Sequence, residues 1–198
     1  MQITVAVVFA YLLGSVPFAF LVTRRRGIDL RHKGSGNLGA TNVLRTAGVW
    51  PAVIVLLLDA LKGSAAVLTA QVITTGTAAP VAAGLASILG HIYPAWLGFR
   101  GGKGVATAAG AFAVLAPAAL GIAVVVFVIT VAATRFVSAG SVAAAIALVI
   151  AAAVTNTPGP VVAGAAGAAI VILFRHRQNM ERLAAGTERR VGLRPFGR

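Results

Sequence analysis

The stretch VATAAGAFAVLAPAALGIAVVVFVITVAA, residues Val105–Ala133, decides how this chain is arranged. It is longer than the about 20 apolar residues that one helix needs to cross a bilayer, and too short for two full crossings. Pro117 lies near its middle, and a proline ring disfavours a continuous helix. The stretch is therefore either one long helix or two short helices.

The positions of the lysines and arginines favour two helices. With two helices the chain crosses the membrane seven times, and every lysine and arginine except Lys62 falls on one side. With one helix, Arg135 and the arginines after Phe174 fall on the other side. Positive residues concentrate on the cytoplasmic side of membrane proteins. We predict an all-α membrane protein of seven transmembrane helices, two of them short, with its N-terminus outside, its C-terminus inside and glycine-rich cytoplasmic loops.

Composition supports lipid as the solvent for most of the chain. It is 59% hydrophobic and 11% charged, with a mean hydropathy of +0.93, whereas soluble domains are about 25% charged. We expect one domain over residues 1–198, with cytoplasmic segments at 24–46, 98–104 and 175–198. The remaining spans are predicted at Ile3–Val22, Val49–Ile73, Ala78–Leu97, Ser138–Val154 and Val161–Phe174.

The net charge of +13 indicates an anionic partner. In a soluble protein it would suggest nucleic acid, but here the cations lie between or after apolar runs, and the interleaved aromatic residues that stack on bases are missing. A membrane surface or an anionic substrate fits better. The chain has no cysteine, and His32, His91 and His176 are far apart in sequence. We therefore expect no metal, no cofactor and no nucleic-acid partner.

Three polar stretches carry the candidate chemistry. They are GSGNLGATN at Gly34–Asn42, GGKGVAT at Gly101–Thr107 and RHRQN at Arg175–Asn179. Glycine lets a backbone approach a ligand, and the other polar side chains are mostly hydrogen-bond donors. The first matches G-x-G-x-x-G but follows no strand of a soluble sheet, so the dinucleotide-binding interpretation fails. The second lacks the Walker A spacing, although a helix that begins at Val105 would favour an anion.

Polar residues inside the spans allow more than one interpretation. Asp59 and Lys62 are three residues apart on one helix face, and we interpret them first as a structural ion pair. Ser138 and Ser141 also share a face, and Ser141 either contacts a substrate or hydrogen-bonds between helices. No Gly-x-Ser-x-Gly sequence is present, so a serine nucleophile of the α/β-hydrolase kind is not expected.

The three stretches resemble the cytoplasmic signatures of the bacterial membrane acyl-phosphate:glycerol-3-phosphate acyltransferases. Met180 stands where the family more often has isoleucine. The segments that match are Ser35–Arg45, Gly101–Thr107 and Arg175–Glu188, with Asp59, Lys62, Gly63 and His91–Pro94.

The resemblance implies a reaction and a location. An acyl group would pass from acyl phosphate to the 1-hydroxyl of glycerol 3-phosphate, giving lysophosphatidate and inorganic phosphate for phospholipid biosynthesis. The enzyme would lie in the bacterial inner membrane with its active site facing the cytoplasm. The implied partners are the two substrates, membrane lipid and the soluble enzyme that makes acyl phosphate.

The resemblance also implies the roles of individual residues. Lys103, His176 and Asn179 would be catalytic, and either His176 or the substrate's own phosphate would accept the proton. Glycerol 3-phosphate would contact Ser35, Arg45, Lys103, Ser141, His176 and Asn179. Asn37, Thr41 and nearby backbone N–H groups would hold the acyl phosphate. The other expected substrate-binding residues are Asn42, Gly101, Gly102, Arg175 and Arg177.

A small transporter or binder of organic phosphates is the alternative. Short, glycine-interrupted helices beside a cationic pocket fit that class as well. The sequence shows no internal repeat, however, and all three polar stretches fall on one side of the predicted topology. Alternating access needs contacts from both sides, so we prefer the enzyme.

Overall fold

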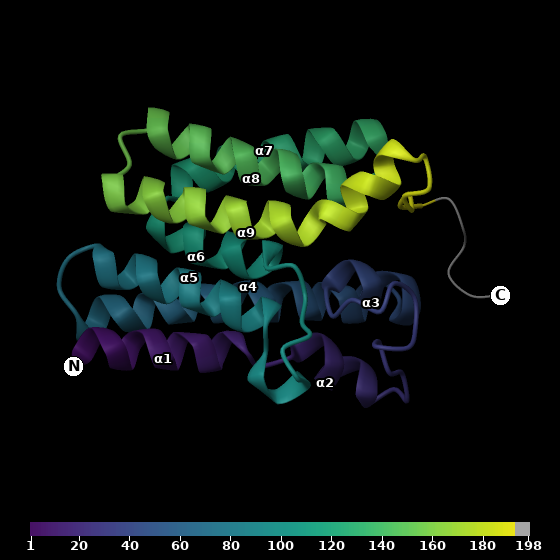
Figure 1. The fold of residues 1–198 in the computed structure, drawn as a ribbon, viewed down its shortest axis with the longest axis horizontal. Coiled ribbons are helices and arrows are strands. Elements are labelled where there is room, and N and C mark those ends of the chain that lie inside the picture. Colours follow the sequence, from purple (N-terminus) through teal and green to yellow (C-terminus); the bar gives the residue numbers. More distant parts are fainter. Residues whose placement is uncertain (193–198) are drawn as a thin grey trace. The chain divides into compact units, whose positions relative to one another are not determined.

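The structure is a computed structural model that describes residues 1–192, which form α-helices and one 3₁₀ helix (Figure 1). The chain divides into two compact units, of which unit 1 covers Met1–Val114 and unit 2 continues from Leu115. Within the described residues, six segments are helical, long and apolar enough to cross a membrane. An all-α membrane fold is therefore confirmed, and residues 193–198 of the predicted tail lie outside the described residues.

Unit 1 is a helical bundle that contains the first two polar stretches. α1 (Gln2–Gly14) packs against both α4 (Val49–Ile73) and α5 (Ala78–Ile92), while α2 (Phe18–Arg24) and α3 (Ala40–Ala47) pack on α4. Figure 1 shows α2 and α3 at the end of this unit opposite the N-terminus. The glycine-rich loop that joins them therefore lies at that same end.

The first predicted span is interrupted in the structure. α1 ends at Gly14 and α2 begins at Phe18, so Ser15–Pro17 form a break within one apolar run. Proline has no N–H for the helix ladder, and it disfavours helical backbone in the residue before it. Pro94 acts in the same way at the end of α5, where Ala95–Leu97 continue only as a 3₁₀ helix.

The stretch Val105–Ala133 divides at the predicted proline. α6 (Val105–Leu115) ends before Ala116, and α7 (Pro117–Thr134) has Pro117 in its first turn, where the missing N–H costs no hydrogen bond. Only α6 is short, whereas two short helices were predicted. α7 extends until Arg135 turns the backbone with a φ of +65°, which makes it long enough to cross a membrane by itself.

Unit 2 is built on α8 (Val137–Val154), which packs against both α7 and α9 (Gly159–Ala184). The sequence predicted that the last span ends at Phe174, but α9 continues to Ala184. No glycine or proline follows Phe174 until Gly186, so nothing in the sequence ends the helix at the membrane surface. The third polar stretch is consequently helical.

Helix backbones in unit 1 touch where glycine replaces a side chain. A Cβ at Gly63 of α4 would overlap the carbonyl oxygen of Thr107 in α6, and one at Gly110 of α6 would overlap the carbonyl oxygen of Ala60 in α4. Lipid-embedded helices depend on such close packing, because burial among lipid tails gains little hydrophobic free energy. α6 is therefore held against α4 by reciprocal glycine contacts.

We predict that Gly110→Ala destabilises unit 1. The added methyl group would force backbone away from backbone, at a cost of about 1–3 kcal/mol. The measurement is thermal unfolding in detergent, with Gly121→Ala as control because a Cβ at Gly121 in α7 meets open space. Equal melting temperatures for the two variants would contradict the contact.

Candidate functional site

The first polar stretch is folded around one asparagine. The Asn42 side chain accepts a hydrogen bond from the backbone N–H of Ser35 at 2.9 Å. Its amide donates to the carbonyl oxygens of Lys33 at 3.1 Å and Asn37 at 3.0 Å. Gly34 has a φ of +66°, and a Cβ there would collide with this side chain. Asn42, predicted to bind substrate, thus uses its polar atoms to hold the loop.

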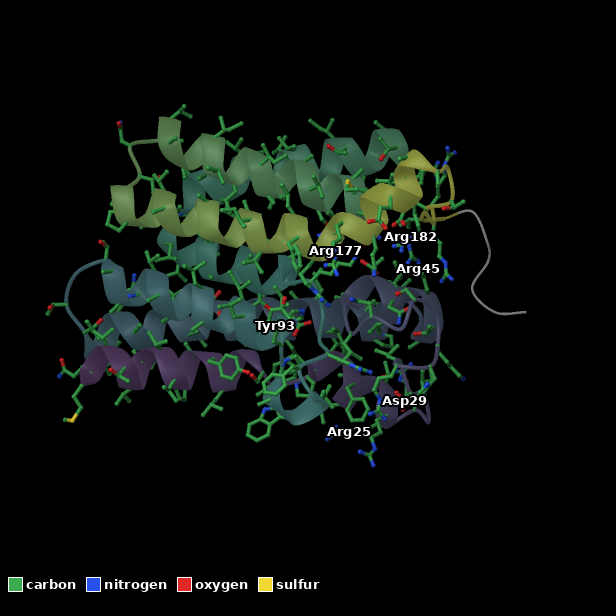
Figure 2. The ribbon with its side chains drawn as sticks, in the orientation of Figure 1. Arg25, Asp29, Arg45, Tyr93, Arg177 and Arg182 are labelled. Atoms are coloured by element: carbon green, nitrogen blue, oxygen red, sulfur yellow. The ribbon has the colours of Figure 1, made fainter. Side chains whose placement is uncertain are left out.

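Apolar anchors and a surface ion pair complete this loop. Leu30, Leu38 and Val43 are buried in a cluster with α2 and α4 residues. The Arg31 guanidinium contacts the Asp29 carboxylate at 2.7 Å, and this hydrogen-bonded pairing lowers the pKa of Asp29 to about 2. Figure 2 shows Arg25, Asp29 and Arg45 at the same end of unit 1. Among the predicted ligands from this stretch, Ser35 is exposed, and the half-buried ones are Asn37, Thr41 and Arg45.

The second polar stretch turns back onto the end of α5. The N–H of Gly101 donates to the carbonyl oxygen of Ile92 at 3.0 Å, and that of Gly102 donates to the carbonyl oxygen of His91 at 3.1 Å. A Cβ at Gly102 would overlap the His91 ring. Lys103 follows, half-buried, two residues before the start of α6 at Val105. The glycine pair therefore sets the course of the backbone that carries Lys103.

A buried charged cluster lies beneath this turn. Lys62 Nζ and Asp59 Oδ1 are 2.8 Å apart with side chains only 2% and 3% exposed, which confirms the predicted ion pair. His91 Nδ1 is 3.4 Å from the same carboxylate oxygen. A small pocket adjoins the cluster. Its lining comprises Gly14–Phe18, Leu38, Asp59, Lys62, His91, Pro94, Gly101 and Gly102.

The residues of the third polar stretch lie on different faces of α9. His176 and Asn179 are buried, Arg175 is half-buried and Arg177 is exposed. His176 Nδ1 is 2.8 Å from the carbonyl oxygen of Ile172. A carbonyl oxygen only accepts, so Nδ1 carries a proton and donates it in this contact. Arg177, labelled in Figure 2, lies 4.3 Å from the centroid of the Phe174 ring.

Glu188 joins this stretch to the start of α8. Its carboxylate accepts hydrogen bonds from Ser138 Oγ at 2.9 Å, Asn179 Nδ2 at 2.6 Å and Arg182 Nε at 2.7 Å. Burial alone would raise the pKa of Glu188, but these donors outweigh it and lower that pKa. Ser141, a predicted ligand on α8, donates to the carbonyl oxygen of Val137 within its own helix.

Sequence reasoning missed two members of these clusters. His91 was considered only among the scattered histidines and as part of a family match, and no spacing links it to Asp59. Glu188 was the last residue of the third matching segment, and no role was predicted for it. Among residues 1–192, no group of three metal-ligating side chains comes together.

Comparison with known proteins assigns the family. A model of the family described as glycerol-3-phosphate acyltransferase matches residues 4–186. The chain belongs to this family. A glycerol-3-phosphate acyltransferase of Synechococcus sp. (strain CC9902) is 46% identical over 187 residues, or 92% of each chain. One of Myxococcus xanthus (strain DK1622) is 47% identical over 186 residues, which cover 93% of this chain and 97% of the relative.

A solved structure supports the same assignment. PlsY (YgiH), described as an integral membrane glycerol 3-phosphate acyltransferase, is 39% identical in its glycerol 3-phosphate form, with a TM-score of 0.93. The match covers 97% of this chain and 96% of that one. A lysophosphatidic acid form of PlsY matches with a TM-score of 0.91. The acyltransferase family therefore accounts for nearly the whole chain.

For this member of the glycerol-3-phosphate acyltransferase family, we predict that Asn42→Asp loosens the first loop. A carboxylate can still accept from Ser35 but cannot donate to the two carbonyl groups, and such losses cost about 1–3 kcal/mol. Trypsin should then cleave after Lys33 faster than in the wild type. Thr46→Ala is the control, because the Thr46 hydroxyl donates to the backbone carbonyl oxygen of Asn42 and not to the loop backbone that the Asn42 side chain holds. Unchanged cleavage of Asn42→Asp would show that the loop does not depend on this side chain.

Proposed function

We propose that this protein transfers an acyl group from acyl phosphate to the 1-hydroxyl of glycerol 3-phosphate, producing lysophosphatidate and inorganic phosphate. The observation that carries the proposal is the match over 97% of the chain to PlsY in its glycerol 3-phosphate form. The lysophosphatidic acid form of that relative corresponds to the product side of the same reaction. We assign the protein to phospholipid biosynthesis in the bacterial inner membrane.

Acyl phosphate suits the side chains that this chain offers. The donor is already activated, because phosphate is a good leaving group, so no acyl-enzyme intermediate is required. Catalysis then consists mainly of placing two anions together and stabilising charge on the carbonyl oxygen. Cationic and N–H-rich stretches serve that purpose. A soluble enzyme that makes acyl phosphate is the proposed upstream partner.

The proposed roles follow the three stretches. Glycerol 3-phosphate would be held by Ser35, Arg45, Lys103, Ser141, His176 and Asn179, and acyl phosphate by Asn37, Thr41 and nearby backbone N–H groups. The hydrogen bonds of Asn42 support an indirect role for that residue, through the shape of the loop. We propose that residues 1–198 act as one domain.

The donor assay tests this function directly. Purified protein given palmitoyl phosphate and labelled glycerol 3-phosphate should form lysophosphatidate, and Lys103→Ala should lose more than about 1.4 kcal/mol of transition-state stabilisation, a tenfold fall in kcat/KM. Uptake of glycerol 3-phosphate into vesicles without any product would instead favour the transporter. Product formed from acyl-coenzyme A but not from palmitoyl phosphate would reject the proposed donor.

We further propose that the chain crosses the membrane seven times, through the six long apolar helices and the shorter α6. The N-terminus would lie outside, and the polar stretches would face the cytoplasm. Lysines and arginines other than Lys62 then share one side, in keeping with the cytoplasmic bias of positive charge. A reporter at the C-terminus should be active only in the cytoplasm, and one at the N-terminus only outside it. Both ends on the same side would refute the seven-span arrangement.

The identity of the base is tested at His176. We propose that the substrate's phosphate accepts the proton and that His176 is an anion ligand, because Arg175 and Arg177 flank it. His176→Asn retains a hydrogen-bond donor, so it should mainly raise the KM for glycerol 3-phosphate. A fall in kcat of about 10²–10⁴-fold with unchanged KM would instead identify His176 as the general base.

A further inference from the structure

Asp59, Lys62 and His91 form a buried cluster in which the Asp59 carboxylate contacts the His91 ring as well as the Lys62 ammonium. We propose that it is a positioning cluster, which fixes the Gly101–Gly102 backbone and thereby directs Lys103 towards the substrate phosphate. The inference rests on the proposed function, because it takes the second polar stretch as part of the glycerol 3-phosphate site. The three residues themselves do not touch the substrate in this proposal.

The cluster connects segments that are distant in sequence. Lys62 Nζ donates to the carbonyl oxygen of Val16 at 3.0 Å, in the break between α1 and α2, and contacts Asp59 at 2.8 Å. The same nitrogen lies 5.6 Å from the centroid of the Phe18 ring. Asp59 Oδ1 meets His91 Nδ1 at 3.4 Å. The Asp59–Lys62 pair thus links α4 to the α1–α2 break through Lys62 and to the end of α5 through Asp59.

The ring of His91 transmits this arrangement to the second stretch. With Nδ1 directed at Asp59, the opposite edge of the ring faces Gly102, where a Cβ would collide with Nε2, Cε1 and Cδ2. The backbone oxygen of His91 accepts the N–H of Gly102 at 3.1 Å. Both the ring and the backbone of one residue therefore hold the residue that precedes Lys103.

Stability alone does not account for such a cluster. Removing two charges from water costs several kcal/mol per ion, and apolar residues of similar volume are often as stable or more stable in the same place. Asp59 and Lys62 are nearly inaccessible inside a membrane-spanning helix, where charged residues usually serve a function. In this proposal the function is to orient the Gly101–Gly102 turn through His91. An apolar pair at positions 59 and 62 could not do so, because it offers no acceptor for the His91 ring.

Two double variants separate orientation from stability. Asp59→Leu with Lys62→Met removes both charges and the acceptor for His91, whereas Asp59→Asn with Lys62→Met restores that acceptor without the charges. We expect the first to raise the KM for glycerol 3-phosphate about tenfold with a smaller change in kcat, since Lys103 is proposed to bind the phosphate of that substrate. The second should recover most of the wild-type KM.

His91→Gln tests the ring without altering the ion pair, so the proposal does not depend on one variant folding. It should also raise the KM for glycerol 3-phosphate. Ser64→Ala is the matched control on the same helix, because its hydroxyl donates at 2.8 Å to the carbonyl oxygen of Gly110, away from the second stretch. This control should keep the wild-type KM.

Binding is measured separately through the rise in melting temperature that glycerol 3-phosphate produces, because at a fixed concentration a ligand of the folded state stabilises it more when it binds more tightly. This rise should shrink in His91→Gln and persist in Ser64→Ala. A wild-type KM together with a full rise in His91→Gln would overturn the positioning role. Absence of product from palmitoyl phosphate in the wild type would reject the proposed donor. The comparison of melting temperatures between His91→Gln and Ser64→Ala would still test whether the cluster positions the glycerol 3-phosphate site.

Discussion

Lipid tails offer no hydrogen-bond partner, and this constraint governs where polar side chains can lie in the chain. Buried hydroxyl groups of Thr23 and Ser87 bond to carbonyl oxygens of their own helices. The buried ammonium of Lys62 has both a carboxylate and a carbonyl oxygen as partners. These three side chains therefore lie where a backbone carbonyl oxygen can accept from them, and the break between α1 and α2 provides the carbonyl oxygen for Lys62.

Much of the fold was predictable because membrane helices follow composition and charge. The helix Val49–Ile73 was predicted with its observed ends, and the division before Pro117 was predicted from the proline. The break at Ser15–Pro17 was missed because apolar residues continue on both sides of it. The length of α9 was missed because hydropathy falls at Arg175 although nothing there ends a helix. Hydropathy marks where lipid ends, whereas backbone hydrogen bonding decides where a helix ends.

The sequence predicted which types of residue make up the candidate site, but not which of them contact one another. The three stretches were identified because they gather cations and donor side chains in a chain that is only 11% charged. The partners of Asn42 could not be inferred, since a buried asparagine and an exposed one look alike in sequence. Glu188 contacts Ser138 across fifty positions of the chain, and His91 near the end of α5 reaches Asp59 on α4. Such pairings depend on how helices pack, which the order of residues does not display.

The hydrogen bonds of Asn42 bear on the thermodynamics of binding. A flexible loop that closes on a ligand loses conformational freedom at about 1–2 kcal/mol for each residue that becomes ordered. Here the loop is already folded around a buried side chain, with Leu30 and Leu38 anchored beneath it. The entropy is lost when the protein folds, so a small anion that contacts the loop does not have to offset it. A ligand with few atoms can then bind usefully and still dissociate quickly, which suits repeated turnover.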